Sequence, residues 1–393
     1  MMSLIEYSKS IFLDGRLIES LSSVFGDRLR DIIEALRKPP SRYYVRVNTL
    51  KAFTDDVYEG LLSRGFEVYR DCLVRDTLYF RVRGPNKLPV ASRVVVADKY
   101  ASESVYQGAD LYAPGVVRAD GVSKGDEVLI TTPYGEPVGW GIAVINGDEM
   151  IKHKYGLAVH VLKSVYEAPK IQDLKEYRDG LIFDQSLPAI ITSIVLDPKP
   201  GEVIVDMCAA PGGKTTHIAQ LTGNNALVLA FDNSNRRIDR LRREICRVNA
   251  SCIRVFKADS RYLDIYYPWI KADRVLIDPP CSTIGVRPKL QDIKTYRDVK
   301  AIAEYQKQFV KVASKIVKNG GVIVYSTCTV TPEENELIID YAVRNLNLKV
   351  DEQPIYIASR GLNIVENYNL LQRFYPDIHD TSGYFIARLV KKA

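Results

Sequence analysis

The sequence lacks the paired cysteines that build structural zinc sites and disulfide frameworks. Its six cysteines are scattered along the chain, at Cys72, Cys208, Cys246, Cys252, Cys281 and Cys328. No two of them form a C-x-x-C pair with the spacing of metal ligands or of a redox motif. We therefore expect a protein with free thiols and no bound metal, in the reducing environment of the cytoplasm.

Long apolar runs are also missing. The chain nowhere approaches the roughly 20 consecutive apolar residues that a membrane span needs. Glu6 lies near the front of the chain, where a signal peptide would be apolar. We expect neither a membrane anchor nor a signal peptide. A hydrophobic content of 46% with 26% charged residues is typical of globular domains.

A strong excess of one charge is lacking as well. The chain has 54 lysines and arginines against 48 aspartates and glutamates, which leaves a net charge of +6. This balance permits a polyanionic partner such as RNA but does not require one. At 393 residues the chain is longer than one ordinary domain of about 150 residues, so more than one domain is expected.

Three sections of different texture follow one another. In residues 1–88, apolar residues recur at helical steps from Ile18 to Arg37, and strand-like and helix-like segments then alternate. Residues 89–165 hold short β-branched runs separated by glycines, as in a compact β-barrel. Residues 166–393 repeat strand then helix. We expect an α/β protein with a small N-terminal α/β unit, an inserted β-barrel and a doubly wound C-terminal domain.

The third section indicates where to look for chemistry. Its short apolar runs predict strands at Val203–Met207, Leu227–Phe231, Ile253–Lys257, Arg274–Ile277 and Val322–Tyr325. Strands that alternate with helices form a mostly parallel sheet, whose ligands bind at the carboxyl ends of the strands. The residues that directly follow each strand are therefore the candidate site.

A loop of small residues follows the first of these strands. It comprises Cys208, Ala209, Ala210, Pro211, Gly212, Gly213 and Lys214, and it leads into a helix whose free N–H groups can meet a ligand. Gly213-Lys214-Thr215 matches the end of an ATP-binding P-loop, and Asp278 could serve as the magnesium ligand of an ATPase. However, Cys208 stands where that motif starts with glycine, and Pro211 removes a backbone donor from the phosphate cradle.

Carboxylates follow four of the strands. Asp232 lies where α/β nucleotide folds place the carboxylate that accepts from ribose hydroxyls, and Asp259 could accept from an adenine amine. Together with Asp206 and Asp278 they suit a cationic sulfonium cofactor better than a triphosphate. We therefore expect S-adenosylmethionine (SAM), and keep an RNA-dependent ATPase that uses Lys214 and Asp278 as an alternative.

Cysteines follow the fourth and fifth strands, in Asp278-Pro279-Pro280-Cys281-Ser282 and Tyr325-Ser326-Thr327-Cys328. A thiolate that adds to carbon 6 of cytosine makes carbon 5 nucleophilic enough to accept a methyl group. Thr331-Pro332-Glu333-Glu334 predicts a helix that begins just beyond Cys328 and whose positive end favours the thiolate. The three remaining cysteines outside the loop, Cys72, Cys246 and Cys252, are expected to be buried and inert.

These motifs together resemble the Sun-domain family of RNA cytosine-5 methyltransferases. The resemblance rests on Arg46 to Lys51, Gln185, the loop from Cys208 to Thr215, the two cysteine motifs, and Arg373-Phe374 with Gly383-Tyr384-Phe385. It implies a Rossmann-like, SAM-dependent catalytic core. Tyr384 stands where many members carry phenylalanine, a change that is expected to leave the chemistry untouched.

The resemblance also implies residue roles. Cys328 would attack carbon 6 and Cys281 would help to release the product, whereas the residues alone do not decide between the two cysteines. Asp278 would contact the cytosine ring and Lys214 would help to organise the site. The SAM pocket would be lined by the residues from Cys208 to Lys214 together with Asp232, Arg237, Asp259 and Asp278.

The inserted segment resembles a PUA domain, through the run from Gly108 to Gly115. The family branch with this insertion methylates cytidine 72 in the acceptor stem of tRNA, with the barrel holding the CCA end. Tyr112, Lys152 and Lys154 are candidate RNA contacts, although core or surface duty explains each of them equally well. We expect the protein to act as a monomer. A catalytically idle RNA-binding scaffold is the remaining alternative, weakened by the presence of both cysteines and all four carboxylates.

Overall fold

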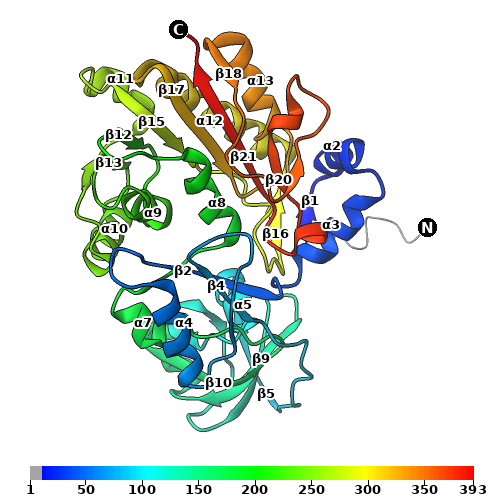
Figure 1. The fold of residues 1–393 in the computed structure, drawn as a ribbon. Coiled ribbons are helices and arrows are strands. Elements are labelled where there is room, and N and C mark those ends of the chain that lie inside the picture. The colour runs from blue at the N-terminus through cyan, green and yellow to red at the C-terminus, as the bar shows by residue number, and fades with distance from the viewer. Residues whose placement is uncertain (1–10) are drawn as a thin grey trace.

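A computed structural model describes residues 11–393, whose strands form four sheets. The largest sheet lies in the upper part of Figure 1 and the inserted barrel at the bottom, with the small α/β unit between them. None of the helices in residues 11–393 is both long and apolar enough to span a membrane. The mixed α/β architecture is the one that the sequence predicts.

The nine-stranded sheet contains the five predicted parallel strands: β12 (Val203–Asp206), β13 (Leu227–Asp232), β14 (Ile253–Lys257), β15 (Ala272–Ile277) and β17 (Val317–Thr327). Their order is β14-β13-β12-β15-β17, and all four neighbouring pairs are parallel. Strands buried on both faces read as continuous apolar runs, which is why the sequence revealed the four inner strands; β14, at the edge, has only Ile253 buried. Their carboxyl ends therefore lie along one edge.

Antiparallel strands that the sequence did not reveal extend the sheet beyond β17. They are β18 (Leu348–Val350), β19 (Ser359–Arg360), β20 (Gln372–Phe374) and β21 (Tyr384–Lys391), of which β21 pairs with β17. The register pairs Thr327 with Phe385. Cys328, which comes directly after Thr327, therefore lies next to Tyr384.

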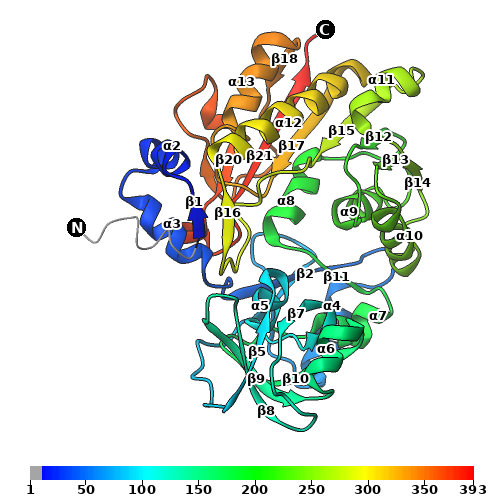
Figure 2. The ribbon, with the colours of Figure 1, turned by 180° about the vertical axis from the view of Figure 1, so that it is seen from behind.

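Helices cover both faces of this sheet (Figures 1 and 2). One face packs against α8 (Leu187–Leu196), α9 (Gly213–Leu221) and α10 (Asn235–Val248). The other face packs against α11 (Leu263–Tyr266), α12 (Tyr296–Ile316) and α13 (Glu336–Asn345). Two apolar layers of this kind hold the strand ends rigidly in place.

The N-terminal segment differs from its prediction. One helix was expected from Ile18 to Arg37, but the structure has α2 (Gly15–Phe25) and α3 (Arg28–Leu36). Gly26 separates them with a φ of +56°, a conformation that glycine adopts without strain. The apolar faces of both helices pack against the catalytic domain through Ile284, Val299, Val330 and Tyr375. Short strands β1 (Ile11–Leu13) and β16 (Asp292–Lys294) pair nearby.

The small α/β unit has a four-stranded sheet in the order β11-β2-β4-β3. Its elements are β2 (Arg42–Val47), α4 (Thr54–Ser63), β3 (Val68–Arg70), β4 (Thr77–Arg81) and β11 (Ile182–Asp184). Strand β11 follows the barrel in sequence yet completes this sheet, and it leads directly into α8. The small unit and the catalytic sheet thus share one continuous connection.

The inserted barrel has its own apolar core and six strands in the order β6-β10-β9-β8-β5-β7. The strands are β5 (Arg93–Ala97), β6 (Leu111–Tyr112), β7 (Val116–Arg118), β8 (Glu127–Thr131), β9 (Pro137–Ala143) and β10 (Leu157–Ser164). The four longer ones were predicted, and the two short ones were not. Helices α5 (Lys99–Val105) and α6 (Gly147–His153) complete it (Figure 2).

Candidate functional site

The carboxyl ends of the parallel strands meet around one cavity of about 230 Å³. The predicted residues that line it are Cys208, Ala210, Asp232, Arg237, Asp259, Asp278, Cys281 and Cys328. They come from five different strand ends, more than 100 residues apart in sequence. The parallel sheet therefore assembles the candidate site at its carboxyl edge, as the sequence predicts.

The two cysteines lie in contact at the centre of this cavity. Their Sγ atoms are 3.1 Å apart, and both are free thiols. The hydrogen bond with Cys328, followed by burial, raises the pKa of the Cys281 thiol well above its usual range. Two thiolates at this distance would repel each other, so the pair holds on to at least one proton at neutral pH.

The helix that was predicted just beyond Cys328 begins later. Helix α13 begins at Glu336, and the Thr331–Asn335 segment forms a turn instead. The Glu334 carboxylate does not cap a helix, because it accepts from the Ser282 N–H at 2.8 Å and from Gln306 Nε2 at 3.1 Å. Its negative charge contributes to the raised pKa of Cys281. The expectation of a positive helix end beside the thiols was therefore wrong.

Asp278 is the hub of the polar contacts in the site. Its Oδ2 atom lies 2.5 Å from Lys214 Nζ, and its Oδ1 atom accepts from Ser326 Oγ at 2.9 Å. The Tyr384 hydroxyl lies 3.3 Å from the same Oδ1 atom. Burial acts to lower the pKa of Lys214, but the charge of Asp278 outweighs it and raises that pKa above its usual range. The hydroxyl of Tyr384, at a position where the sequence departs from the family pattern, therefore lies within reach of Asp278. Its effect on the chemistry stays a prediction.

Asp206 is buried beneath the loop of small residues. Its carboxylate accepts from Thr215 Oγ1 at 2.7 Å and from the Cys208 N–H at 3.2 Å. Burial raises the pKa of Asp206 to about 6. The carboxylate makes no ion pair with any of residues 11–393. Thr215 and Lys214 are both engaged with aspartates, so neither is free for the role it has in a P-loop.

A second cavity of about 230 Å³ opens on the other side of this loop. It is lined by the loop from Cys208 to Lys214 and by Asp184, Gln185, Ser186, Asp206 and Asp278. Cys208, Ala210 and Asp278 line both cavities, so the two are adjacent. Burial raises the pKa of Cys208 well above its usual range, which keeps it an uncharged thiol. Gln185 was singled out only for its family motif and not as a site residue.

Arginines neighbour the two outer carboxylates. Arg237 lies 3.1 Å from Asp232, and Arg261 lies 2.5 Å from Asp259, whose pKa its hydrogen bonds lower. Sequence reasoning missed Arg261, and it also missed Tyr305 and Phe309 of α12, which form one wall of the first cavity. Their spacing in the sequence indicates only an apolar helix face. That this face borders the first cavity is visible only in the folded structure.

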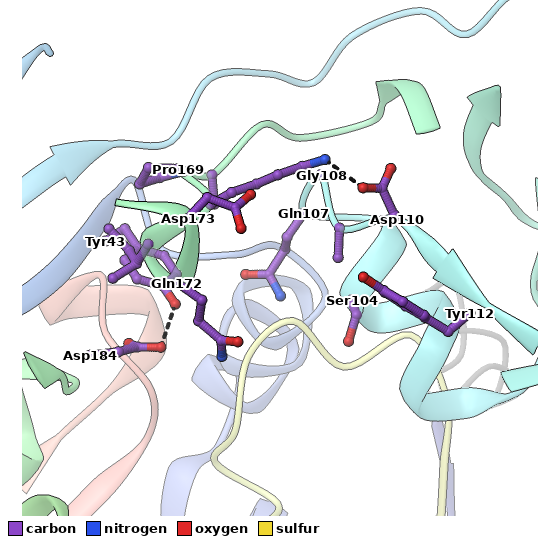
Figure 3. A pocket seen from close by; sticks show the side chains of 14 residues that line it. Tyr43, Ser104, Gln107, Gly108, Asp110, Tyr112, Pro169, Gln172, Asp173 and Asp184 are labelled. Atoms are coloured by element: carbon purple, nitrogen blue, oxygen red, sulfur yellow. Dashed lines mark hydrogen bonds and ion pairs between the residues drawn. The ribbon is translucent and has the colours of Figure 1, made fainter. Parts of the chain in front are cut away.

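A third cavity, of about 370 Å³, lies between the barrel and the small unit (Figure 3). Tyr112 lines it and is 59% exposed. Lys152 and Lys154 do not line it, and the ammonium of Lys154 donates to the backbone carbonyl of Val116. Polar side chains that the sequence did not single out complete the lining, among them Ser104, Gln107, Gln172 and Asp173.

The three cysteines outside the site and its loop differ from expectation in two cases. Cys252 is buried as predicted, whereas Cys72 and Cys246 are exposed. Cys246 lies on α10 and Cys72 in the connection from β3 to β4. Their position away from the cavities agrees with an absence of catalytic duty.

Comparisons with known proteins identify two segments. The family model of the 16S rRNA methyltransferases RsmB/F matches residues 193–390, and the PUA domain matches residues 93–165. The chain is 43% identical to the tRNA (cytosine(72)-C(5))-methyltransferase of Pyrococcus horikoshii, over 95% of this chain and 96% of that protein. It is 28% identical to human tRNA (cytosine(72)-C(5))-methyltransferase NSUN6, over 98% and 96%. The crystal structure of NSun6 from Pyrococcus horikoshii with SFG superposes with a TM-score of 0.90 at 42% identity, covering 97% of this chain and 99% of that one.

Proposed function

Because the chain belongs to the RsmB/F, or Sun-domain, family of SAM-dependent RNA cytosine-5 methyltransferases, we propose that it methylates carbon 5 of cytidine 72 in the acceptor stem of tRNA. The observation that carries the chemistry is the pair of thiols 3.1 Å apart beside Asp278 and Lys214. The similarity to tRNA cytidine-72 enzymes over nearly the whole chain supports the substrate.

The residues around the first cavity fit SAM. Asp232 would accept from the ribose hydroxyls and Asp259 from the adenine amine, while the loop from Cys208 to Lys214 would meet the rest of the cofactor; all of them line the two adjoining cavities. Bound SAM supplies an electrophilic methyl group on a positively charged sulfur. The carboxylates along this edge favour that charge.

In the proposed reaction, Cys328 acts as the nucleophile. Its sulfur forms a bond to carbon 6 of the cytosine, and the electron pair of the 5,6 double bond becomes available at carbon 5 to take the methyl group. Asp278 is held by its contacts with Lys214, Ser326 and Tyr384. In the proposed reaction its carboxyl group contacts the cytosine ring and supports protonation of that ring. Carbon 5 then carries both the new methyl group and its original proton.

Cys281 is proposed to complete the reaction by removing that proton. Before the attack, contact with Cys328 raises the pKa of Cys281 and keeps it protonated. Once Cys328 becomes an uncharged thioether, this contact no longer opposes a charge on Cys281. Cys281 can then release its proton to water and act as the base. Its thiolate takes the carbon 5 proton, the electron pair of that bond re-forms the 5,6 double bond, and the carbon–sulfur bond breaks so that Cys328 leaves as a thiolate.

The third cavity is the proposed site for the CCA end of the tRNA. Tyr112 offers an exposed aromatic ring for base stacking, and the amides of Gln107 and Gln172 can hydrogen bond to base edges (Figure 3). Tyr43 and Asp184 line this cavity as well, and Asp184 also lines the second cavity. A single strand of RNA could therefore pass from the barrel to the catalytic cleft. We also propose that the protein acts as a monomer in the cytoplasm.

The substrate is tested by mapping 5-methylcytidine after reaction of unmodified tRNA with SAM. The proposal expects one modified position, cytidine 72, and loss of modification when the CCA end is removed. Methylation at another position, with no dependence on the CCA end, would refute the assignment. Calorimetry with ATP and with SAM tests the ATPase alternative, which requires tight ATP binding without SAM binding.

A further inference from the structure

The chain that follows Cys281 enters the barrel. Residues 281–292 connect the site to β16, and Leu290 lies nine positions after Cys281. The Leu290 side chain is 2% exposed and belongs to the apolar core of the barrel, whose other buried members in the described part of the chain all come from residues 95–161. The segment from Cys281 to Asp292, here called the Cys281 connection, is therefore anchored in a different domain from the one that holds the thiols.

Charged side chains of α5 hold this anchor in place. The Glu103 carboxylate accepts from the Leu290 N–H at 3.1 Å, and Lys99, one turn earlier on the helix, pairs with Asp292 at 2.8 Å. Asp292 is 6% exposed and also pairs with Lys289, at 2.9 Å. Burial raises the pKa of Glu103, and the charges of Lys99 and Lys289 counteract this effect. Removing one partner of a buried charge is costly, so α5 fixes the Cys281 connection at Leu290 and at Asp292.

The same helix borders the third cavity. Ser104, near the end of α5, and Gln107, just beyond it, line that cavity (Figure 3). Gln107 Nε2 donates to the backbone carbonyl of Glu103 at 3.2 Å. Neighbouring residues on a helix point about 100° apart, so Ser104 faces the cavity while Glu103 faces the Cys281 connection. In Figures 1 and 2, α5 lies beside β16, where the connection ends. One helix of the barrel therefore contacts both the proposed site of the CCA end and the Cys281 connection.

At its other end, the Cys281 connection packs tightly against the chain around Cys328. The Gly285 N–H donates to the Cys328 carbonyl at 3.0 Å, and the Gly285 carbonyl accepts from the Gly383 N–H at 2.7 Å. A side chain at Gly285 would collide with the Gly383 backbone. The base that removes the carbon 5 proton must lie within hydrogen-bond reach of it, and a misplacement of about 1 Å can lower a rate roughly a hundredfold. The position of the connection is therefore part of the position of Cys281.

We propose that Glu103 is a positioning residue for Cys281. By holding the Cys281 connection at Leu290, it keeps Cys281 against Cys328. RNA that binds in the third cavity stabilises the same helix, so the CCA end supports the removal of the carbon 5 proton as well as the binding of the tRNA. This role rests on the proposed function, in which Cys281 is the base and the third cavity holds the CCA end.

Trapping of the covalent adduct in the full chain tests the role of Glu103. Glu103→Ala removes the acceptor of the Leu290 N–H, so Cys281 should lie within reach of the carbon 5 proton less often. With SAM and unmodified tRNA, this variant should accumulate more methylated, denaturation-resistant adduct than wild type. Its kcat should fall roughly tenfold, the loss expected for a hydrogen bond to a charged group, and its affinity for SAM should not change. Glu103→Gln keeps an oxygen acceptor, so it should restore most of the rate and lower the adduct again.

Glu149→Ala is the matched control. Glu149 is a barrel carboxylate that also accepts a backbone N–H, from Asn146 at 2.9 Å, but this contact lies within the capping box of α6. The control should keep the adduct level and kcat of wild type. Lys99→Gln breaks the pair with Asp292 and should also accumulate adduct, which provides the test if Glu103→Ala fails to fold.

Two results would overturn the positioning role. A lower kcat without additional adduct in Glu103→Ala and Lys99→Gln would reduce the contacts of α5 to a structural role. Equal adduct in Glu149→Ala would show that any loosening of the barrel has the same effect. Cys281→Ala distinguishes these failures from a failure of the proposed function: if it traps adduct and the α5 variants do not, the positioning role alone is wrong, and if it traps none, the proposed function is wrong as well.

Discussion

The Asp278 carboxylate accepts hydrogen bonds from three side chains, those of Lys214, Ser326 and Tyr384. Of these contacts, the one with Tyr384 comes from a residue at which this sequence departs from the pattern of many family members. The hydroxyl also lies 3.3 Å from Ser326 Oγ, so it bridges two groups of the site. At the scale of single residues, the sequence pattern showed that Tyr384 departs from the family, but not that its hydroxyl reaches Asp278 and Ser326.

Tyr384→Phe should therefore lower kcat without unfolding the protein. One hydrogen bond is worth roughly 0.5–1.5 kcal/mol, which corresponds to a loss of about twofold to thirteenfold. Steady-state methylation of tRNA at saturating SAM measures the effect, and the melting temperature serves as a check on stability. Tyr341→Phe, on α13 and away from both cavities, should change neither quantity. An unchanged kcat in Tyr384→Phe would show that Asp278 does not need the third contact.

Asp206 predicts a pH dependence. Burial raises its pKa to about 6, so the folded state favours the protonated form more than the unfolded state does. This contribution to the free energy of unfolding is present at low pH and is lost as pH rises through about 6.

Asp206→Asn removes that ionisation. Relative to wild type, the variant should be more stable at pH 8 than it is at pH 5, as measured by chemical denaturation without SAM. A difference between variant and wild type that is the same at both pH values would contradict the assigned pKa shift.

At the scale of elements, the turn from Thr331 to Asn335 explains why local patterns reach a limit. Thr331-Pro332-Glu333-Glu334 has the spacing of a capping box, which predicts a helix start at Pro332. The structure instead directs Glu334 to Ser282 and Gln306, partners 52 and 28 residues away in sequence. Because those partners are distant, no local pattern could reveal them.

Glu334→Ala should destabilise the loop that carries Cys281. It leaves the Ser282 N–H, Gln306 and Thr331 without their acceptor, and we expect a loss of about 2–4 kcal/mol in the free energy of unfolding. Urea denaturation measures the loss. The neighbouring Glu333→Ala removes contacts with two side chains, Ser20 and Tyr296, and no backbone donor, and it should cost less. Equal losses for the two variants would argue against a special role for Glu334.

The parallel strands were predictable for a simple physical reason. All except β14, at the edge of the sheet, are largely buried on both faces. All five appear as short apolar runs, and a carboxylate or a cysteine follows each of them. The strands β19 and β20 are only two and three residues long and carry no comparable pattern. The pairing of β11 with β2 joins segments on either side of the barrel, so it depends on the three-dimensional fold alone.

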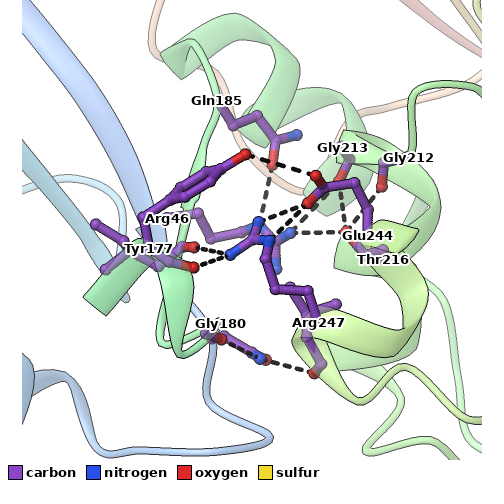
Figure 4. A network of polar contacts seen from close by, with 12 residues as sticks. Arg46, Tyr177, Gly180, Gln185, Gly212, Gly213, Thr216, Glu244 and Arg247 are labelled. Atoms are coloured by element: carbon purple, nitrogen blue, oxygen red, sulfur yellow. Dashed lines mark hydrogen bonds and ion pairs between the residues drawn. The ribbon is translucent and has the colours of Figure 1, made fainter. Parts of the chain in front are cut away.

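At the scale of the whole molecule, the small α/β unit links the barrel to the catalytic sheet. Buried Arg46 in β2 donates to Gln185, to Gln220 and to Thr216 of α9. Arg247 of α10 donates to the backbone carbonyls of Tyr177 and Ile182 (Figure 4). These contacts hold the strand that leads into the site, and they position the barrel relative to the cleft.

Tyr112 on the barrel predicts a separable effect on RNA binding. Tyr112→Ala should raise KM for tRNA by roughly tenfold, since stacking of one base on an aromatic ring is worth about 1–3 kcal/mol, and it should leave SAM affinity unchanged. Tyr100→Ala is the control, because Tyr100 is 75% exposed on the same barrel but does not line the cavity. If both variants behave alike, the CCA end does not bind in this cavity. A tRNA without its CCA end should abolish the difference between Tyr112→Ala and wild type.

The division of labour between the two thiols is the central claim, and trapping of the covalent intermediate tests it most directly. Wild type, Cys281→Ala and Cys328→Ala are each incubated with SAM and unmodified tRNA, and the mixtures are separated under denaturing conditions. The account predicts a stable protein–RNA adduct in Cys281→Ala, because nothing removes the carbon 5 proton, and neither adduct nor methylation in Cys328→Ala. An adduct in Cys328→Ala and none in Cys281→Ala would contradict it and exchange the roles of the two cysteines.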